Sequence, residues 1–388
     1  MQEGQRGSMK VVIAPDSFKG SLSALAVATS IERGIHRVDA NIQTHLVPMA
    51  DGGEGTVAAL VAAAGGEIIT RRVTGPLGES VEGYFGILAD GETGIIEMAA
   101  ASGLPLVPHH LRNPLVTTTY GTGELIKAAL DSGAKQLIIG IGGSATNDGG
   151  AGMATALGIK FLDKSGQELP LGGGNLHLLQ SVDLSGLDPR ILSTDIRIAC
   201  DVINPLCGPK GASAVYGPQK GATSEMVEIL DNNLNHYADL VEKSTGKQVK
   251  HIPGAGAAGG LGAGLLAFLN AKLQPGVEIV LTAANMDVLL RDADLVITGE
   301  GQTDRQTLFG KAPAGVAEVA RRHGVPIVCI SGSLALGAEE LYNQGFAGLF
   351  SITEGPISLD EAMNEAAQLL ERAAERVIRL YLTGRKRG

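Results

Sequence analysis

The sequence lacks several features that would place it in a familiar functional class. Its three cysteines, Cys200, Cys207 and Cys329, do not have the spacing of a zinc site. Such a low, odd count is typical of a protein from a reducing cytoplasm, which is where we expect this one. No run approaches the ~20 apolar residues of a membrane span. Residues 1–8 are polar, have no signal-peptide core and resemble a tag remnant before a native start at Met9.

Positive charge is also scarce. The formal net charge is −10, and the one basic cluster is the C-terminal Arg385-Lys386-Arg387. This balance disfavours a nucleic-acid partner. An anionic substrate would therefore need local positive charge, from single lysines or from helix N-termini.

Standard catalytic motifs are missing as well. The chain contains no G-x-x-x-x-G-K-[ST], no H-E-x-x-H and no G-x-S-x-G. Residues 254–259 do match G-x-G-x-x-G, but only a weak strand with a proline precedes them. A chance match is easy in a chain with 55 glycines, so a dinucleotide-dependent oxidoreductase is kept as the less favoured alternative.

Glycine is what the sequence has in excess. It makes up 55 of 388 residues, about twice its usual share. The glycines cluster after apolar runs, most densely in IIGIGGSATNDGGAGMATALG at residues 138–158. A loop with so few side chains suits a ligand that must come close to the backbone.

The order of apolar runs and helical patterns predicts an α/β fold with two domains. Residues 9–75 alternate strand and helix, as in a parallel sheet, and three strand-then-loop units follow residue 285. Residues 66–103 instead show close turns and antiparallel character. We therefore expect a discontinuous Rossmann-like domain, 9–75 plus 286–388, interrupted by a mixed α/β domain at 76–285. One long amphipathic helix is expected over residues 359–382.

Acidic and polar side chains follow the predicted strands. Ligands of open parallel sheets bind beyond the carboxyl ends of the strands, where these residues would gather. Carboxylates beside glycine loops can hold Mg²⁺ or orient a hydroxyl group. The alternative is that they are helix N-caps and turn formers. The residues are Asp16, Ser17, Lys19, Asp51, Ser144, Thr146, Asn147, Asp148, Asp201, Asn204, Glu300, Asp304 and Lys311.

Many of these loops lie in longer strings that span nearly the whole chain from Met9. They include VVIAPDSFKGSLSA, ADGGEGT, IIGIGGSATNDGGAGM, ACDVINPLCG, GPQKGA and VITGEGQTD. Together these strings resemble one family, the bacterial glycerate kinases of type I. The resemblance implies phosphorylation of D-glycerate by ATP with Mg²⁺, giving 2-phosphoglycerate. It also implies two α/β domains, one inserted in the other, with the active site in the cleft.

The residues and the resemblance together give a predicted site. The catalytic residues would be Asp304, Asp201 and Lys19, with Asp304 favoured for the hydroxyl group. The substrate would contact Asp16, Ser17, Lys19, Asp51 and Lys311. The nucleotide would contact Gly142, Gly143, Ser144, Thr146, Asn147, Gly299, Glu300 and Gly301. The metal ligands would be Asp201 and Asp148.

The sequence departs from the family pattern at four positions. The family commonly has TGEGRIDSQ followed by HGK. Here Gln302 replaces the arginine of the first string, and the basic residue is Arg305 instead. Phe309 replaces the histidine of the second string. Gly20 replaces a glutamate. Phosphorylation of the 3-hydroxyl group, and a non-enzymatic sensor of acid metabolites, remain alternatives. The sequence does not give the oligomeric state.

Overall fold

The computed structural model describes residues 8–308 and 310–385, so residues 1–7 of the expected tag remnant, and Phe309, lie outside the described residues. The chain divides into two compact units. Unit 1 comprises Met1–Ala50, Ala58–Gly65 and Val277–Gly388, and unit 2 comprises Asp51–Val57 and Gly66–Gly276. Residues 51–57, 66–75 and 277–285 thus fall on the other side of the boundaries expected from the sequence. None of the described helices combines the length and hydrophobicity needed to cross a bilayer.

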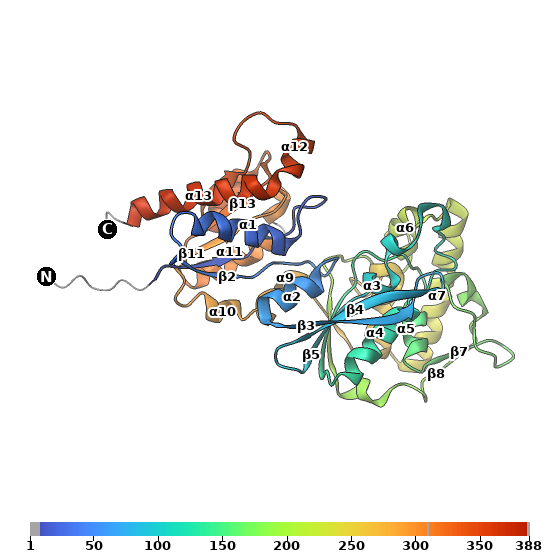
Figure 1. Cartoon of the computed structure of the whole chain (residues 1–388). Helices are drawn as coiled ribbons and strands as arrows, with labels where there is room; N and C mark the ends of the chain where they lie inside the picture. The colour runs from blue at the N-terminus through green and yellow to red at the C-terminus, as the bar shows by residue number, and fades with distance from the viewer. Residues whose placement is uncertain (1–7, 309, 386–388) are drawn as a thin grey trace. The chain divides into compact units, whose positions relative to one another are not determined.

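Unit 1 is built on a sheet of five parallel strands (Figure 1). These are β1 (Lys10–Ile13), β2 (Gln43–Leu46), β11 (Leu295–Thr298), β13 (Ile327–Ser331) and β15 (Phe346–Ser351). Their spatial order is β15-β13-β11-β1-β2. Counted within the unit this is 2-1-3-4-5, a doubly wound order that reverses between β1 and β11. The predicted parallel sheet is confirmed, although its order is not the 3-2-1-4-5-6 of dinucleotide-binding domains.

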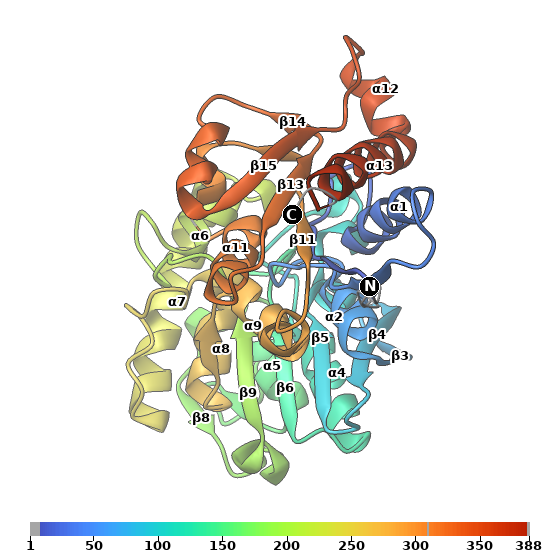
Figure 2. The same cartoon turned by 90° about the vertical axis from the view of Figure 1, so that its left-hand side faces the viewer.

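Helices pack on both faces of this sheet (Figure 2). Val11 and Ile13 of β1 are fully buried and join a core that includes α1 (Ala24–His36) and α13 (Ala366–Arg385). Helix α1 begins at Ser23, whose side chain accepts a hydrogen bond from the Ala26 amide. The other elements are α2 (Thr56–Ala64), α9 (Gly276–Ala283), α10 (Met286–Leu289), η7 (Arg305–Leu308), α11 (Ala312–Arg322), η8 (Ala338–Gln344), α12 (Leu359–Asn364), β12 (Gln302–Thr303) and β14 (Ser333–Leu334).

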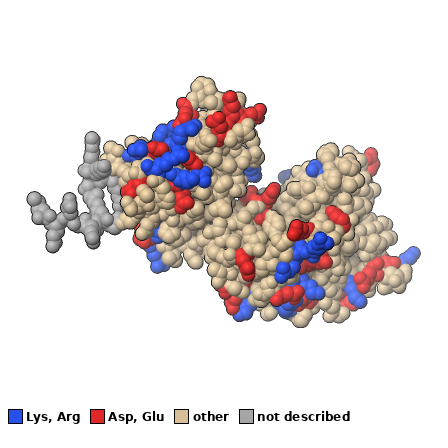
Figure 3. All heavy atoms as spheres, in the orientation of Figure 1, with Lys and Arg blue, Asp and Glu red and all other residues tan. Residues whose placement is uncertain are grey.

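The expected single C-terminal helix is interrupted. Helix α12 begins with a capping box between Ser358 and Glu361 and ends at Asn364. One residue, Glu365, separates it from α13. Lysine and arginine side chains lie beside acidic side chains on the face of unit 1 that Figure 3 shows. Arg33 and Arg37 both pair with Glu371, so their charges are locally compensated.

Unit 2 contains a six-stranded mixed sheet in the order β10-β9-β6-β5-β4-β3. Strands β5, β6, β9 and β10 are parallel, and β4 and β3 continue the sheet as an antiparallel hairpin, as the sequence predicted. Its strands are β3 (Gly66–Thr74), β4 (Ser80–Leu88), β5 (Thr93–Glu97), β6 (Gln136–Gly140), β9 (Asp195–Ala199) and β10 (Lys272–Gln274), with a separate pair β7 (Lys160–Leu162) and β8 (Ser181–Asp183).

Helices and short 3₁₀ turns complete unit 2. The longest helix, α7, presents the fully buried Tyr237 to the core, where its hydroxyl group donates to the Gly149 carbonyl at 3.1 Å. The core therefore supports the glycine-rich loop directly. The elements are α3 (Ala99–Ser102), α4 (Tyr120–Asp131), α5 (Ala151–Ala156), α6 (Ala212–Tyr216), α7 (Ser224–Thr245), α8 (Leu261–Phe268), η1 (Leu104–Leu106), η2 (His109–Leu111), η3 (Gly173–Leu178), η4 (Pro189–Ser193), η5 (Pro218–Lys220) and η6 (Ala257–Gly260).

The close packing of α1 on α13 predicts the effect of a small substitution. A Cβ atom at Gly34 would lie 2.2 Å from the Glu371 carbonyl oxygen and 2.8 Å from the Ala374 Cβ. Gly34→Ala should therefore lower the free energy of unfolding by about 1–3 kcal/mol, the usual cost of overpacking. Urea denaturation followed by circular dichroism measures it. Gly384→Ala in α13 is the matched control, because open space surrounds that position. Equal stability of the two variants would contradict the packing.

Candidate functional site

The predicted site residues fall into two groups, one in each unit. In unit 1 they follow β1 and β11, the strands at which the winding order reverses. Ligands of doubly wound sheets bind at this reversal point. In unit 2 they follow β6 and β9 or belong to the segment 51–57, which lies against the ends of these strands.

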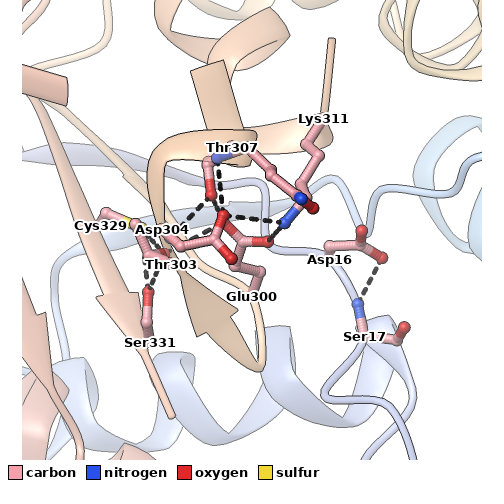
Figure 4. Close-up of polar contacts among 10 residues, drawn as sticks. Asp16, Ser17, Glu300, Thr303, Asp304, Thr307, Lys311, Cys329 and Ser331 are labelled. Atoms are coloured by element: carbon pink, nitrogen blue, oxygen red, sulfur yellow. Dashed lines mark hydrogen bonds and ion pairs between the residues drawn. The ribbon is translucent and has the colours of Figure 1, made fainter. Parts of the chain in front are cut away.

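The unit 1 group is anchored by backbone pairing that continues beyond the strands. The Asp16 amide donates to the Gly299 carbonyl at 2.8 Å, two residues beyond the bond from Ala14 to Ile297. The Asp16 carboxylate accepts from the Ser17 amide at 2.6 Å. The loop after β1 is thereby held beside the loop that carries Glu300 (Figure 4).

Glu300 occupies the centre of the unit 1 group (Figure 4). Its side chain is buried, and its Oε1 accepts from the hydroxyl groups of Thr307 at 2.6 Å and Thr303 at 3.1 Å. Its Oε2 lies 3.3 Å from the Lys311 ammonium group. A carboxylate with both oxygens occupied by protein groups is suited to holding a lysine in place. We therefore assign it a positioning role rather than the expected nucleotide contact.

Lys311 and Asp304 form the accessible part of this group. The Lys311 ammonium group lies 3.6 Å from Asp304 Oδ1, and their side chains are 37% and 28% exposed. Asp304 Oδ1 also accepts from the Gln306 amide at 2.7 Å, which fixes the direction of the carboxylate. The arrangement thus offers a cation and a carboxylate to a substrate that carries both an anionic group and a hydroxyl group.

A buried layer lies behind Glu300. Thr303 Oγ1 is 2.7 Å from Ser331 Oγ, which is 3.2 Å from Cys329 Sγ. Burial raises the pKa of the Cys329 thiol to about 11. The thiol therefore stays protonated near neutral pH and acts as a packing group, not as a nucleophile.

The remaining predicted residues of unit 1 are less tightly organised. Lys19 is exposed in the turn that pairs Phe18 with Leu22. A Cβ atom at Gly301 would lie 3.7 Å from the Lys19 amide nitrogen, so the two loops are adjacent through their backbones. Arg305, the displaced basic residue, forms an exposed ion pair with Glu340 at 3.3 Å. It therefore has a local partner on the surface of unit 1.

In unit 2, the glycine-rich loop leaves the end of β6. Gly143 is exposed and has a left-handed φ of 75°, whereas Ser144, Thr146 and Asn147 are buried. The Ala145 amide donates to the Ser102 carbonyl at 3.0 Å, and its carbonyl accepts from Thr117 at 2.9 Å. The loop therefore presents backbone at residues 142–143 and keeps its polar side chains beneath the surface.

Asp148 is placed differently from the prediction. It is fully buried, and its Oδ2 accepts from the Thr119 amide and hydroxyl groups at 2.8 Å each and from the Gly152 amide at 3.2 Å. Its Oδ1 accepts from the Gly150 amide at 3.1 Å. Burial raises the pKa of this carboxyl group, and the hydrogen bonds oppose the rise. These contacts speak against the expected metal role, because the carboxylate holds the loop together instead.

Asp51 and Asp201 come together at one position in unit 2. The Gly276 amide donates to Asp201 Oδ1 at 3.0 Å, and a Cβ atom at Gly276 would lie 2.5 Å from the Asp51 carbonyl carbon. Both aspartates are exposed, and Asp51 Oδ1 accepts from the Gly53 amide at 3.0 Å. The structure thus brings two acidic loops to the ends of the parallel strands.

The carboxylates of Asp51 and Asp201 are the candidate ligands for a magnesium ion. Within the described part of the chain, no three His, Cys, Asp or Glu side chains are grouped as a protein-only metal site. Mg²⁺ in phosphoryl-transfer enzymes is usually held by one or two carboxylates together with substrate phosphates. Exposed oxygen donors from Asp51 and Asp201 suit that mode of binding.

Two organising residues were missed by the sequence reasoning. Glu97, the last residue of β5, accepts from the Val57 amide at 2.6 Å and from the Tyr84 hydroxyl group at 3.0 Å. Lys220 lies beneath the glycine-rich loop, and burial lowers its pKa to about 7, against the opposing effect of Asp148. Two sequence features could have indicated these residues. Glu97 is an acidic residue at the end of an apolar strand, and Lys220 is the lysine of the string GPQKGA.

The G-x-G-x-x-G stretch has no dinucleotide-site geometry. Residues 247–253 form no strand, so the expected weak strand is wrong. Residues 257–260 form the 3₁₀ turn η6, and a Cβ atom at Gly259 would lie 1.9 Å from the Thr146 carbonyl oxygen. These glycines therefore allow η6 to pack against the loop at 142–150.

Comparisons with known proteins agree along nearly the whole chain. The sequence model of the glycerate kinase family matches residues 11–382. The glycerate kinase of Bacillus subtilis is 56% identical over 366 residues, which cover 94% of this chain and 96% of that protein. The glycerate 2-kinase of Escherichia coli is 53% identical over 369 residues, covering 95% and 97%. A crystal structure of a protein assigned as glycerate kinase 2 from Salmonella typhimurium LT2 matches with a TM-score of 0.89 and 49% identity, covering 98% of this chain and 100% of that one.

The environment of Glu97 predicts a dependence of stability on pH. Burial raises the pKa of this carboxyl group above its usual 4.5. The folded state therefore binds more protons than the unfolded state above pH 4.5, so this contribution to stability is lost as pH rises. Glu97→Gln removes the titration, and the oxygen of the new side-chain amide can still accept from Val57. The urea midpoint of the variant, relative to the wild type, should increase between pH 4.5 and pH 7.5.

The exposed Glu82 on the neighbouring strand β4 provides the control. Glu82→Gln should leave the pH dependence unchanged within experimental error. A Glu97→Gln midpoint that runs parallel to the wild type at every pH would contradict the burial effect.

Proposed function

Because the chain belongs to the glycerate kinase family, we propose that it transfers the γ-phosphoryl group of ATP to the 2-hydroxyl group of D-glycerate. The products are 2-phosphoglycerate and ADP. The observation that carries the proposal is the group of Asp304, Lys311 and Glu300 at the reversal point of the unit 1 sheet. The relative named glycerate 2-kinase supports the choice of hydroxyl group.

The unit 1 group supplies the proton chemistry. The 2-hydroxyl oxygen forms a bond to the γ-phosphorus, the bond from that phosphorus to the β,γ-bridging oxygen breaks, and ADP leaves. The hydroxyl proton passes to Asp304, whose carboxylate is fixed by the Gln306 amide. Lys311, held by Glu300, binds the glycerate carboxylate or the transferred phosphoryl group. Asp16, Ser17 and the exposed Lys19 on the adjacent loop complete the contacts to glycerate.

The unit 2 group binds the nucleotide. The backbone N–H group of Gly143, with the hydroxyl group of Ser144, contacts the phosphates. Gly142 donates its own N–H to the Gly52 carbonyl at 3.1 Å and lets the ligand approach the backbone, while Thr146 and Asn147 shape the loop from inside. A magnesium ion, held by Asp201 with Asp51 and the phosphates, would neutralise charge that develops on the nucleotide. Asp148 is not included among its ligands. Gly299 is packed closely against the Ile330 carbonyl, whereas a Cβ atom at Gly301 would make only ordinary contacts with Phe18 and Lys19.

The proposal is tested by following turnover and product together. ADP release is measured with D-glycerate and MgATP, and the product is identified by phosphorus and proton NMR. We expect steady ADP release and 2-phosphoglycerate. Formation of 3-phosphoglycerate alone would overturn the regiochemistry, and no glycerate-dependent ADP release would overturn the activity. Binding of NAD without ADP release would favour an oxidoreductase.

Asp304→Asn tests the proton acceptor. The amide oxygen can keep the hydrogen bond from Gln306, but the group can no longer accept the hydroxyl proton. We expect kcat to fall at least ~10²-fold, the usual scale for a lost general base, with little change in melting temperature. Glu318→Gln on the exposed face of α11 is the control and should turn over normally. A folded Asp304→Asn enzyme within a few fold of the wild type would make Asp304 a turn former.

A further inference from the structure

Lys220 is a charged side chain that the steps above do not use. It ends the 3₁₀ turn η5 and is 2% exposed. The next residue, Gly221, has a left-handed φ of 93°, and a Cβ atom there would lie 2.4 Å from the Arg112 carbonyl oxygen. The chain direction at Lys220 is therefore fixed by a position that only glycine fills without strain.

The Lys220 ammonium group contacts the glycine-rich loop directly. It donates to Ser144 Oγ at 3.0 Å and to the Thr146 carbonyl oxygen at 2.7 Å. These two acceptors lie 76 and 74 residues away along the chain. Both acceptors are neutral. The Asp148 carboxylate raises the Lys220 pKa through its charge and is not one of these two acceptors.

The contact with Lys220 controls where the Ser144 hydroxyl proton can point. An ammonium group only donates, and the Thr146 amide also donates to Ser144 Oγ at 3.1 Å. Two donors on one oxygen leave its own proton to point elsewhere. Its acceptors in the protein are the Thr146 carbonyl oxygen at 3.3 Å and Thr146 Oγ1 at 3.2 Å. Both are long for an O–H···O bond, so an anionic acceptor would compete well for the proton.

The surface of the loop indicates the side from which a ligand comes. Gly143 is exposed and Gly142 half-buried, whereas Ser144 and Lys220 lie beneath them. Nearby, the fully buried Asn147 has a side-chain nitrogen with no hydrogen-bond partner among the described residues. A buried donor of this kind is an independent sign that the loop receives an acceptor from outside the chain.

We infer that Lys220 is a positioning residue, which directs the Ser144 hydroxyl group and places positive charge beneath a nucleotide phosphate bound at residues 142–144. The inference rests on the proposed function, because ATP is taken as the ligand of this loop. The glycerate carboxylate is the other anion in the reaction. Separate Michaelis constants for MgATP and D-glycerate show which of the two anions, the phosphate or the carboxylate, binds at this loop.

Lys220→Met removes the charge and keeps an unbranched chain in the core. Ser144→Ala removes the hydroxyl group, and the double variant measures their coupling. We expect each single variant to raise KM for MgATP about ten- to a hundredfold, the scale of a charge-assisted hydrogen bond. KM for D-glycerate should stay within about twofold. The double variant should resemble the single ones, because Lys220 acts through Ser144.

Lys210→Met is the matched control, since Lys210 is an exposed lysine ten residues earlier. It should leave both Michaelis constants unchanged. An unchanged KM for MgATP in folded Lys220→Met would overturn the inference, as would a rise in KM for glycerate instead. Fully additive effects in the double variant would show that Lys220 does not act through Ser144, and would overturn it too.

A second measurement separates failure of the inference from failure of the proposed function. The shift in melting temperature caused by MgATP needs no turnover. If the wild type releases no ADP with glycerate, the proposed function fails, but MgATP should still stabilise the wild type more than Lys220→Met. Equal stabilisation of both proteins overturns the inference. Ser144→Ala supplies the same comparison if Lys220→Met does not fold.

Discussion

Parallel strands end at the same edge of a sheet, and the main loops of the candidate site depend on this constraint. In unit 1 the pairing of β1 with β11 continues past the strands, through the bond from the Asp16 amide to the Gly299 carbonyl. In unit 2 the amide of Met98, one residue beyond β5, donates to the carbonyl of Gly140, the last residue of β6. Backbone pairing therefore holds the loops side by side, so that side chains of neighbouring loops lie close to one another.

Burying a charged group costs free energy unless the group is hydrogen-bonded. The carboxylates of the site are therefore of two kinds: buried ones with several hydrogen-bond donors, and more exposed ones. Glu300 receives two hydroxyl groups and an ammonium group, and Asp148 receives four donors. Glu97 similarly holds the start of α2. These buried carboxylates make loops rigid, while the carboxylates of Asp304 and Asp201 are more exposed. A rigid inner layer of this kind is what precise positioning of a phosphoryl group requires.

The sequence predicted the strands, their order along the chain and the polar loops, because apolar runs and glycine clusters are local signals. It did not separate Asp148 from Asp201, which follow strands of similar composition. The two aspartates differ in their hydrogen-bond donors, which are distant in the sequence. The amide of Thr119, 29 positions away, donates to Asp148, whereas the amide of Gly276 donates to Asp201. Lys220 was missed for the same reason, since its partners lie more than 70 positions away. The break between α12 and α13 depends on a single residue within a continuous amphipathic pattern.

The two central lysines work in opposite electrostatic settings. Lys311 lies between Glu300 and Asp304, so with all three groups ionised this part of unit 1 carries one net negative charge. Lys220 meets neutral oxygens, and its charge adds to the potential of the loop at 142–147. A nucleotide carries several negative charges, whereas glycerate carries one and must also give up a proton. The loop above the buried Lys220 suits the more highly charged ligand, because phosphate oxygens would favour the protonated form of this lysine. The group with an additional carboxylate suits the ligand that loses a proton, because accepting it brings that group to neutrality.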